Sequence, residues 1–237
     1  MCGRSSLTKT EKEIEARFKA TFYSEELERY NPLPNYNVAP THMHPVIQMD
    51  DQKHIHLYKW GLVPYWAKDI SFGTKLINAR SETLLEKAAF KSLVTSKRCI
   101  IPLDGFYEWK KDGKNKIPFR ILTTDQEIFS VAGLWDIWRN EMTGENIHSF
   151  TIITIEANAF MKDIHDRMPA ILTNQNEKNW LDIEIRPNDA IELLLPYPSE
   201  LMKAYEVSNQ VNSVKVNNST LLDPVIKQSK PIQTSLF

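Results

Sequence analysis

The chain has 237 residues, which is enough for one large domain or two small ones. Its formal net charge of -1 excludes a protein that binds nucleic acid through its overall charge, so a DNA-binding surface would have to be a local basic patch. No apolar run is long enough to span a membrane and no signal peptide opens the chain, so we expect a cytoplasmic protein without a membrane partner.

Helices are predicted in the flanking parts of the chain. Thr10 and Glu13 have the spacing of a capping box and open the first helix. Ser81 is predicted to cap a later helix, because apolar residues recur between 84 and 89. The other predicted helices span residues 24–30, 157–164 and 177–183.

Strands are predicted mainly in the middle of the chain, and a turn at Asp112 and Gly113 joins two of them into a hairpin. The strand-like runs are 46–60, 99–101, 105–109, 118–122, 128–135 and 149–155. This order favours an α+β fold, a single domain with a mixed or antiparallel, barrel-like β-sheet flanked by helices. We expect that domain to span residues 2–216 and a flexible C-terminal tail to span 217–237.

Cys2 follows the initiator Met1, and we expect Met1 to be removed because cysteine is small. Cys2 would then carry an α-amine and a thiol, whose ordinary pKa values are roughly 7.7–8.0 and about 8.5. An aldehyde would form an imine with this amine, and the thiol would close a five-membered thiazolidine ring in an intramolecular step. The other cysteine, Cys99, precedes an apolar strand and is expected to be a buried core thiol.

Seven segments in order along the chain point to a known family. They are Met1–Arg4, Tyr36–Thr41, Trp60–Ala67, Leu76–Glu82, Pro102–Trp109, Ala132–Trp135 and His165–Pro169. Together they resemble the SOS-response-associated peptidase family, which senses abasic sites in single-stranded DNA. The resemblance runs from residue 2 to about Val214. Ser81 departs from the alanine that the family often has there, which should matter little because its neighbours are kept.

The resemblance implies a catalytic group made of Cys2, Asn78, Glu108 and His165. Cys2 matches the residue that forms a thiazolidine link with the ring-opened abasic sugar. Asn78 matches the residue that positions the amine, Glu108 the acid/base residue, and His165 a second proton-transfer group. The two His-x-His pairs lack further ligands at suitable spacing, so no metal site is expected, and no cofactor motif is present.

A basic rim for DNA is expected around this group. Arg4, Arg80 and Arg167 each lie two residues from Cys2, Asn78 or His165, and the resemblance assigns them to phosphate contacts. Trp66 and Pro40 are expected to form an apolar surface for stacking bases, with a core position as the alternative for Trp66. The hydroxyl of Thr154 is expected to help orient the site. The expected partner is single-stranded DNA with an abasic site. We expect the protein to be a monomer and to be associated with the nucleoid when it is bound to DNA.

The last residues, with Gln233 followed by Leu236 and Phe237, resemble the bacterial peptide that binds the replication sliding clamp. A chance ending is the alternative.

The main hypothesis for the function is a sensor that crosslinks abasic sites. The family name adds an (auto)peptidase activity, which is a hydrolase function, and lyase activity is also possible. The competing functions are an N-terminal-nucleophile amidohydrolase and a non-catalytic adaptor for single-stranded DNA, which would tolerate loss of the Cys2 thiol.

Overall fold

A computed structural model describes residues 2–226 of the chain. Its helices are α1 (Glu11–Phe18), α2 (Ser24–Arg29), α3 (Lys91–Ser96), α4 (Ala159–Lys162), α5 (Asn174–Leu181) and α6 (Pro187–Glu192), with short 3₁₀ helices η1 (Ile70–Lys75), η2 (Ser81–Thr83), η3 (Ser199–Leu201), η4 (Asn209–Asn212) and η5 (Ser219–Leu222). Its strands are β1 (Ser5–Leu7), β2 (Thr21–Phe22), β3 (Asn35–Val38), β4 (Met43–Gln48), β5 (Asp51–Trp60), β6 (Asn78–Arg80), β7 (Arg98–Leu103), β8 (Gly105–Asp112), β9 (Asn115–Thr123), β10 (Phe129–Arg139), β11 (Asn146–Glu156), β12 (Arg167–Pro169), β13 (Ile171–Leu172) and β14 (Met202–Glu206). None of the helices within residues 2–226 combines the length and apolar character needed to cross a membrane.

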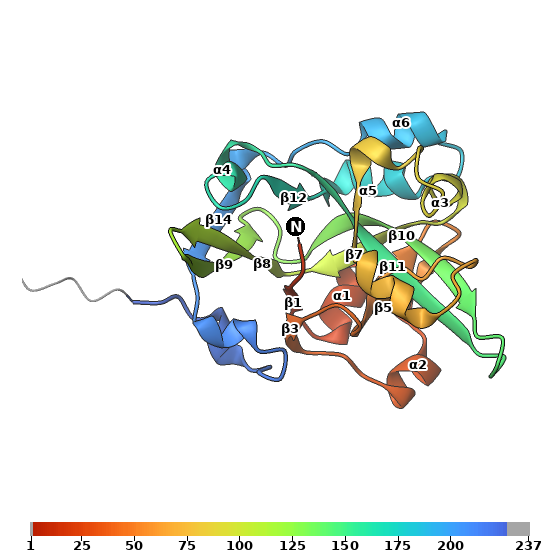
Figure 1. The fold of residues 1–237 in the computed structure, drawn as a ribbon, viewed down its shortest axis with the longest axis horizontal. Coiled ribbons are helices and arrows are strands. Elements are labelled where there is room, and N and C mark those ends of the chain that lie inside the picture. The colour runs from red at the N-terminus through yellow and green to blue at the C-terminus, as the bar shows by residue number, and fades with distance from the viewer. Residues whose placement is uncertain (1, 227–237) are drawn as a thin grey trace, which may run out of the picture.

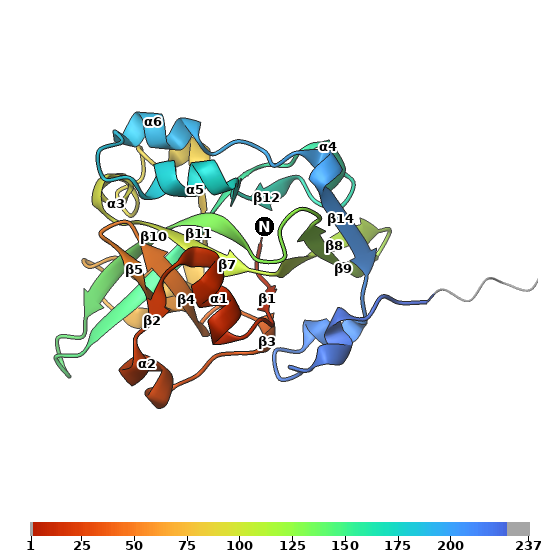
Figure 2. The ribbon, with the colours of Figure 1, turned by 180° about the vertical axis from the view of Figure 1, so that it is seen from behind.

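Five strands close into a mixed β-barrel. β5, β4, β7, β10 and β11 are neighbours in that order, and pairing between β11 and β5 completes the ring. The closing pair runs parallel, with Phe150 beside Trp60, whereas the other pairs are antiparallel. A second sheet, in the order β14-β9-β8-β1-β3, lies at one end of the barrel, and α5 and α6 lie together above the barrel in both views (Figures 1 and 2). The predicted α+β domain with a mixed, barrel-like sheet is therefore confirmed.

The locally encoded features match their predictions. Thr10 forms a complete capping box with Glu13, whose carboxylate accepts the backbone N–H of Thr10 at 2.8 Å. The hairpin between β8 and β9 turns at Gly113, which adopts a positive φ of 58° while Asp112 pairs with Asn115. Glycine adopts this backbone conformation without the steric cost that a side chain imposes, so the Asp-Gly pair determines where the hairpin turns.

The helix predicted to begin at Ser81 is wrong. Ser81 opens only the short η2 helix, and the next α-helix, α3, begins at Lys91. The buried residues of this stretch are Leu84 and Phe90, while Ala88 is exposed. Residues six positions apart lie on different faces of an α-helix, so an irregular turn buries these two side chains where a helix would expose one.

Packing continues beyond the predicted domain boundary at residue 216. Leu221, in η5, is fully buried in a small apolar cluster with Tyr107, Val207 and Val211. The backbone of Val225 also donates a hydrogen bond to the carbonyl of Glu206. The C-terminal segment that contains η4 and η5 therefore packs against the second sheet as far as the structure describes it.

Arg98 is a buried cation that joins β7 to the segments around α3 and α5. It is completely buried, and its guanidinium donates hydrogen bonds to the carbonyl oxygens of Val94, Trp180 and Asp182. We expect Arg98→Met to lower the free energy of unfolding by about 3–5 kcal/mol, because three carbonyls, two of them in buried contacts, lose charge-assisted donors. Urea unfolding checks this, with the exposed Lys178→Met as the control, which should change stability by less than about 0.5 kcal/mol. A loss below about 1 kcal/mol for Arg98→Met would contradict the expectation.

Candidate functional site around Cys2

The residues ahead of β1 lie beside the second half of β8. β1 pairs antiparallel with β8, with Ser5 opposite Phe106. The pairing continues toward the N-terminus, where the backbone N–H of Tyr107 donates to the carbonyl of Arg4 at 2.9 Å. Antiparallel strands run in opposite directions, so the register places Gly3 beside Glu108 and Cys2 one residue beyond it. The Glu108 carboxylate is near enough to act electrostatically on the Cys2 thiol. Figures 1 and 2 both show the segment that leads into β1 between β8 and β12.

The Cys2 thiol is buried and held in its neutral form. The residue is 0% exposed, and its sulfur lies 3.9 Å from the carbonyl oxygen of Arg4. Burial raises the pKa of the Cys2 thiol well above its ordinary value, and the nearby Glu108 carboxylate raises that pKa further. A negative charge and a dry environment both disfavour a thiolate, so at neutral pH the thiol keeps its proton and needs a base in order to react.

Asn78 connects the barrel to Cys2. Its strand, β6, runs parallel to β11 with Asn78 opposite Ile152, and this pairing fixes the amide at the edge of the barrel. Nδ2 of Asn78 donates a hydrogen bond to the carbonyl oxygen of Cys2 at 2.8 Å. Oδ1 of the same amide is buried and accepts no hydrogen bond from any residue between 2 and 226. An acceptor that lacks a donor therefore lies beside the backbone of Cys2, where a primary amine could donate to it.

Glu108 and His165 line one cavity of about 630 Å³. The cavity is also lined by Arg4, Trp109, Lys111, Lys116 and Asn212. Glu108 is 3% exposed, so its carboxylate is largely shielded from bulk water. The backbone N–H of Arg167 donates to Nδ1 of His165 at 2.9 Å, which leaves the proton of a neutral imidazole on Nε2. The exposed carboxylate of Asp166 lies 2.8 Å from the same Nδ1, and it is the acceptor when the imidazole carries a second proton.

The four predicted catalytic residues therefore come together at one place. Asn78 contacts Cys2 directly, Glu108 affects its thiol electrostatically, and Glu108 shares a cavity with His165. The set offers an amide that can fix an amine, a carboxylate that can accept a proton and an imidazole that can donate one. Such a combination suits the addition of a nitrogen and a sulfur nucleophile to a carbonyl carbon.

The three predicted DNA-binding arginines differ in their surroundings. The guanidinium of Arg4 donates to Oδ1 of Asn37 at 2.7 Å and to the carbonyls of Val211 and Asn212. Arg167 donates two hydrogen bonds to Glu82 and one, at 2.6 Å, to the carbonyl of Thr154. Arg80 is exposed to solvent. Arg4 and Arg167 thus hold the fold around the cavity, and Arg80 is the one among the three whose side chain faces water.

The remaining predicted contacts are divided between surface and core. Trp66 is 45% exposed, so it is not a core tryptophan. Its ring packs edge-on against that of Phe72, with 5.4 Å between the ring centroids. Pro40 is half-buried in the turn that follows β3. Thr154 is fully buried, and its hydroxyl lies 3.4 Å from the carbonyl of Ala79. Thr154 can therefore affect the site through the strands that hold Asn78 and Arg167, since its side chain does not reach the surface.

Comparisons with known proteins identify the family. Residues 1–214 match the family model for SOS response associated peptidases. The chain belongs to this family. It is 45% identical to the abasic site processing protein YoaM of Bacillus subtilis (strain 168), over 94% of this chain and 98% of that protein. It is 34% identical to the abasic site processing protein YedK of Escherichia coli (strain K12), over 95% of this chain and 100% of that protein.

Structural comparison gives the same result for the fold of this SOS response associated peptidase. A crystal structure of a protein from Bacteroides thetaiotaomicron superposes with a TM-score of 0.87 at 31% identity, and it covers 95% of this chain and 100% of that one. The match therefore extends over nearly all of the chain. The family resemblance carried by seven short segments of the sequence is confirmed.

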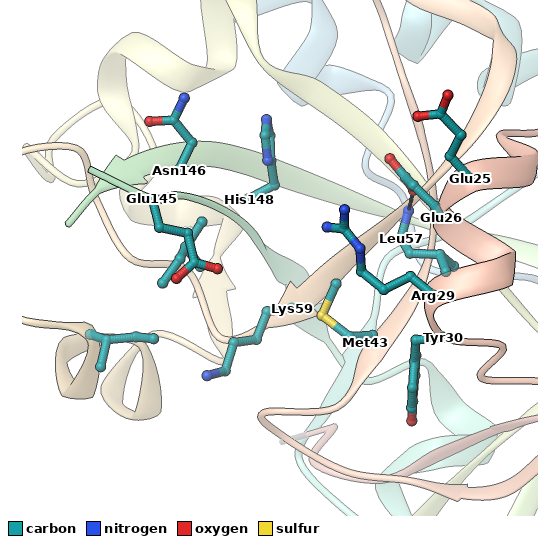
Figure 3. Close-up of a pocket in the computed structure, with 12 residues that line it drawn as sticks. Glu25, Glu26, Arg29, Tyr30, Met43, Leu57, Lys59, Glu145, Asn146 and His148 are labelled. Atoms are coloured by element: carbon teal, nitrogen blue, oxygen red, sulfur yellow. Dashed lines mark hydrogen bonds between the residues drawn. The ribbon is translucent and has the colours of Figure 1, made fainter. Parts of the chain in front are cut away.

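A second cavity of about 480 Å³ lies on a different part of this family member, between α2, β5 and β11 (Figure 3). Its lining includes both acidic and basic side chains, among them Glu25, Glu26, Arg29, Lys59 and Glu145. Figure 3 shows Glu26 accepting a hydrogen bond from the backbone N–H of Leu57, at 2.7 Å. This cavity contains none of the predicted site residues. Within residues 2–226, no three histidine, cysteine or carboxylate side chains are arranged to hold a metal ion.

Three predicted residues fall outside the described structure, and the structure adds two lysines to the site. The clamp-binding residues Gln233, Leu236 and Phe237 lie outside the described residues. Lys111 and Lys116 line the cavity, and neither is among the predicted site residues. The Asp112-Gly113 turn is the feature of the sequence that predicts their position, because counting outward from it along both strands places Lys111 opposite Lys116.

Proposed function

We propose that this chain senses abasic sites in single-stranded DNA and links to them covalently through Cys2 once Met1 has been removed. The observation that carries the proposal is the Asn78 amide, which donates to the Cys2 carbonyl and holds a buried, unpaired acceptor beside it. The names of the relatives support it, since YoaM, YedK and HMCES of Xenopus tropicalis (31% identical, over 97% of this chain and 80% of that protein) are all abasic site processing proteins. The burial of Cys2 describes the chain that still carries Met1, and the reactive amine exists only after that residue has left.

The first step joins nitrogen to carbon. Oδ1 of Asn78 accepts one N–H of the neutral Cys2 amine and aims its lone pair at the aldehyde carbon of the ring-opened abasic sugar. The addition gives a carbinolamine. His165, when it carries a proton on both ring nitrogens, donates the one on Nε2 to the hydroxyl oxygen, which leaves as water, and the nitrogen keeps its hydrogen so that a protonated imine forms. One C–N double bond has then replaced the C–O double bond of the aldehyde.

The second step joins sulfur to the same carbon. The neutral Cys2 thiol transfers its proton to the Glu108 carboxylate as sulfur adds to the carbon of the protonated imine, whose nitrogen becomes a neutral N–H. The proton on Glu108 then returns to His165, which lines the same cavity. The result is a five-membered thiazolidine, and the two steps together release one water molecule. The family description also includes peptidase activity, and the removal of Met1 is the one peptide-bond cleavage that the crosslink requires.

The test uses a single-stranded oligonucleotide with one abasic site. We expect processed protein to give a product that survives heating in denaturant, with the mass of protein plus DNA minus one water. Protein with an additional residue retained ahead of Cys2 should give none, because its amine is blocked. An oligonucleotide carrying the tetrahydrofuran analogue, which has no aldehyde, should also give none. A stable product with either control would contradict the proposed chemistry, and so would its absence with processed protein whose mass confirms the loss of Met1.

A further inference from the structure

The β8–β9 hairpin is a concentrated positive charge on a chain whose net charge is -1. Between Trp109 and Lys116 it carries one carboxylate, that of Asp112, and four lysines: Lys110, Lys111, Lys114 and Lys116. All four lysines are exposed. Within the part of the chain that the structure describes, none of them forms an ion pair or a side-chain hydrogen bond. Their charge is therefore not neutralised by an ion pair with any residue that the structure describes.

Two of these lysines are placed directly against each other at the cavity. Lys111 lies opposite Lys116 in the register of the two strands, so both side chains project from the same face. Like charges in this position destabilise a β-sheet, and neighbouring ion pairs would normally relieve the repulsion. Both lysines also line the cavity that contains Glu108 and His165. The repulsion is thus located at the mouth of the proposed reactive site, where an anion would remove it.

The arginines nearest the cavity do not offer free donors to such an anion. The guanidinium of Arg4 is committed to Asn37 and to two backbone carbonyls, and that of Arg167 to Glu82 and Thr154. The ion pair with Glu82 neutralises Arg167 within the protein. Arg4 has only neutral acceptors and keeps its charge, but its donors are occupied. Among the basic side chains that line the cavity, Lys111 and Lys116 are therefore the ones whose ammonium groups form no hydrogen bond within residues 2–226.

We propose that Lys111 and Lys116 bind a phosphodiester group of the DNA strand that carries the abasic site. The inference rests on the proposed function and adds the path of the strand, which leaves the cavity over the β8–β9 hairpin. Two ammonium groups on one face can bind the two free oxygens of one phosphate, and they do so without reading the base. Such contacts suit a sensor whose lesion has no base, and they hold the sugar next to Glu108 and His165.

The double variant Lys111→Gln/Lys116→Gln tests the inference. Its reversible binding to a fluorescent single strand with the tetrahydrofuran analogue is measured by anisotropy over a range of salt concentrations. Losing the one phosphate that the two lysines neutralise should reduce the slope of log affinity against log salt by about 0.7, the contribution of one phosphate of a single strand. In the crosslinking reaction, the half-saturating DNA concentration should rise roughly tenfold at low salt, while the rate at saturation changes much less.

The control variant is Lys53→Gln/Lys178→Gln, which makes the same change in charge. These lysines are exposed and lie on β5 and α5, which both views show far from β8 and β9 (Figures 1 and 2). The control should keep the wild-type salt slope. An equal fall in both variants would mean that only the overall charge matters, and it would overturn the inference.

The two levels of the proposal can fail separately. If wild-type protein crosslinks but Lys111→Gln/Lys116→Gln keeps the wild-type salt slope, the hairpin contact is wrong and the proposed function stands. If wild-type protein binds the analogue but never crosslinks, the proposed function fails, and the salt slope still tests the hairpin. Because like charges repel in the free protein, the double variant should unfold at the wild-type temperature or above it. The single variant Lys111→Gln, with half the change in slope, provides a second measurement.

Discussion

Replacing Cys2 with alanine is expected to abolish the heat-stable product with abasic single-stranded DNA. Alanine is small enough for Met1 to be removed, so the variant keeps a free amine and can still form an imine. It has no sulfur to close the ring, and an imine hydrolyses readily. We expect the yield of stable product to fall at least a hundredfold, roughly the advantage that a tethered nucleophile confers.

Borohydride separates the roles of the amine and the thiol in this variant. Reduction of the imine should trap a covalent product from Cys2→Ala, whereas protein with a blocked amine should give none. Cys2→Ser should resemble Cys2→Ala without borohydride, because serine closes a much less stable oxazolidine. Binding to the tetrahydrofuran analogue should stay within about twofold of wild type in both variants, since neither change removes a charge that contacts phosphate. An undiminished heat-stable product from Cys2→Ala would rule out the thiazolidine and would mean that another nucleophile forms the link.

The features of the fold that depend on neighbouring residues could be predicted from the sequence, whereas those that depend on distant pairing could not. The capping box at Thr10 and the turn at Gly113 are determined by a few adjacent residues, and both are present. Closure of the barrel depends on the pairing of Phe150 with Trp60, about which neither segment carries a local signal. The helix predicted at Ser81 failed for a related reason, because tertiary burial of Leu84 and Phe90 overrides the local apolar pattern.

The site shows the same division. Cys2, Asn78, Glu108 and His165 are four weak signals in four separate segments, and only their order along the chain linked them before the fold was known. The sequence could not show how the arginines are used. Arg4 contacts the carbonyl of Val211, 207 residues away, so its commitment to an internal partner appears only in three dimensions. The uncompensated charge is on the hairpin, whose register follows from its turn and was therefore within reach of the sequence.

Replacing Glu108 with glutamine is expected to slow ring closure about a hundredfold or more at neutral pH, the usual contribution of a positioned general base. Glutamine keeps the shape of the side chain but cannot accept the thiol proton. The substitution also removes a negative charge that raises the pKa of the Cys2 thiol, so that pKa should be lower in the variant than in the wild type. A slower reaction despite a more acidic thiol would show that the carboxylate acts by taking the proton, since its electrostatic effect works in the opposite direction.

The pH dependence of single-turnover rates measures this role directly. In Glu108→Gln, the thiol proton must leave to hydroxide, so the rate should rise by about tenfold per pH unit as long as the thiol is mostly protonated. The wild-type rate should rise less steeply above neutral pH, because the Glu108 carboxylate accepts the thiol proton in place of hydroxide. In Glu108→Ala, added formate or acetate should restore part of the rate by occupying the space of the lost carboxylate. Glu145→Gln, which makes the same chemical change in the other cavity, should behave like wild type. Equal rates for Glu108→Gln and wild type at every pH would leave the buried carboxylate without a part in the reaction, and the proton of the Cys2 thiol would then need another acceptor in the cavity.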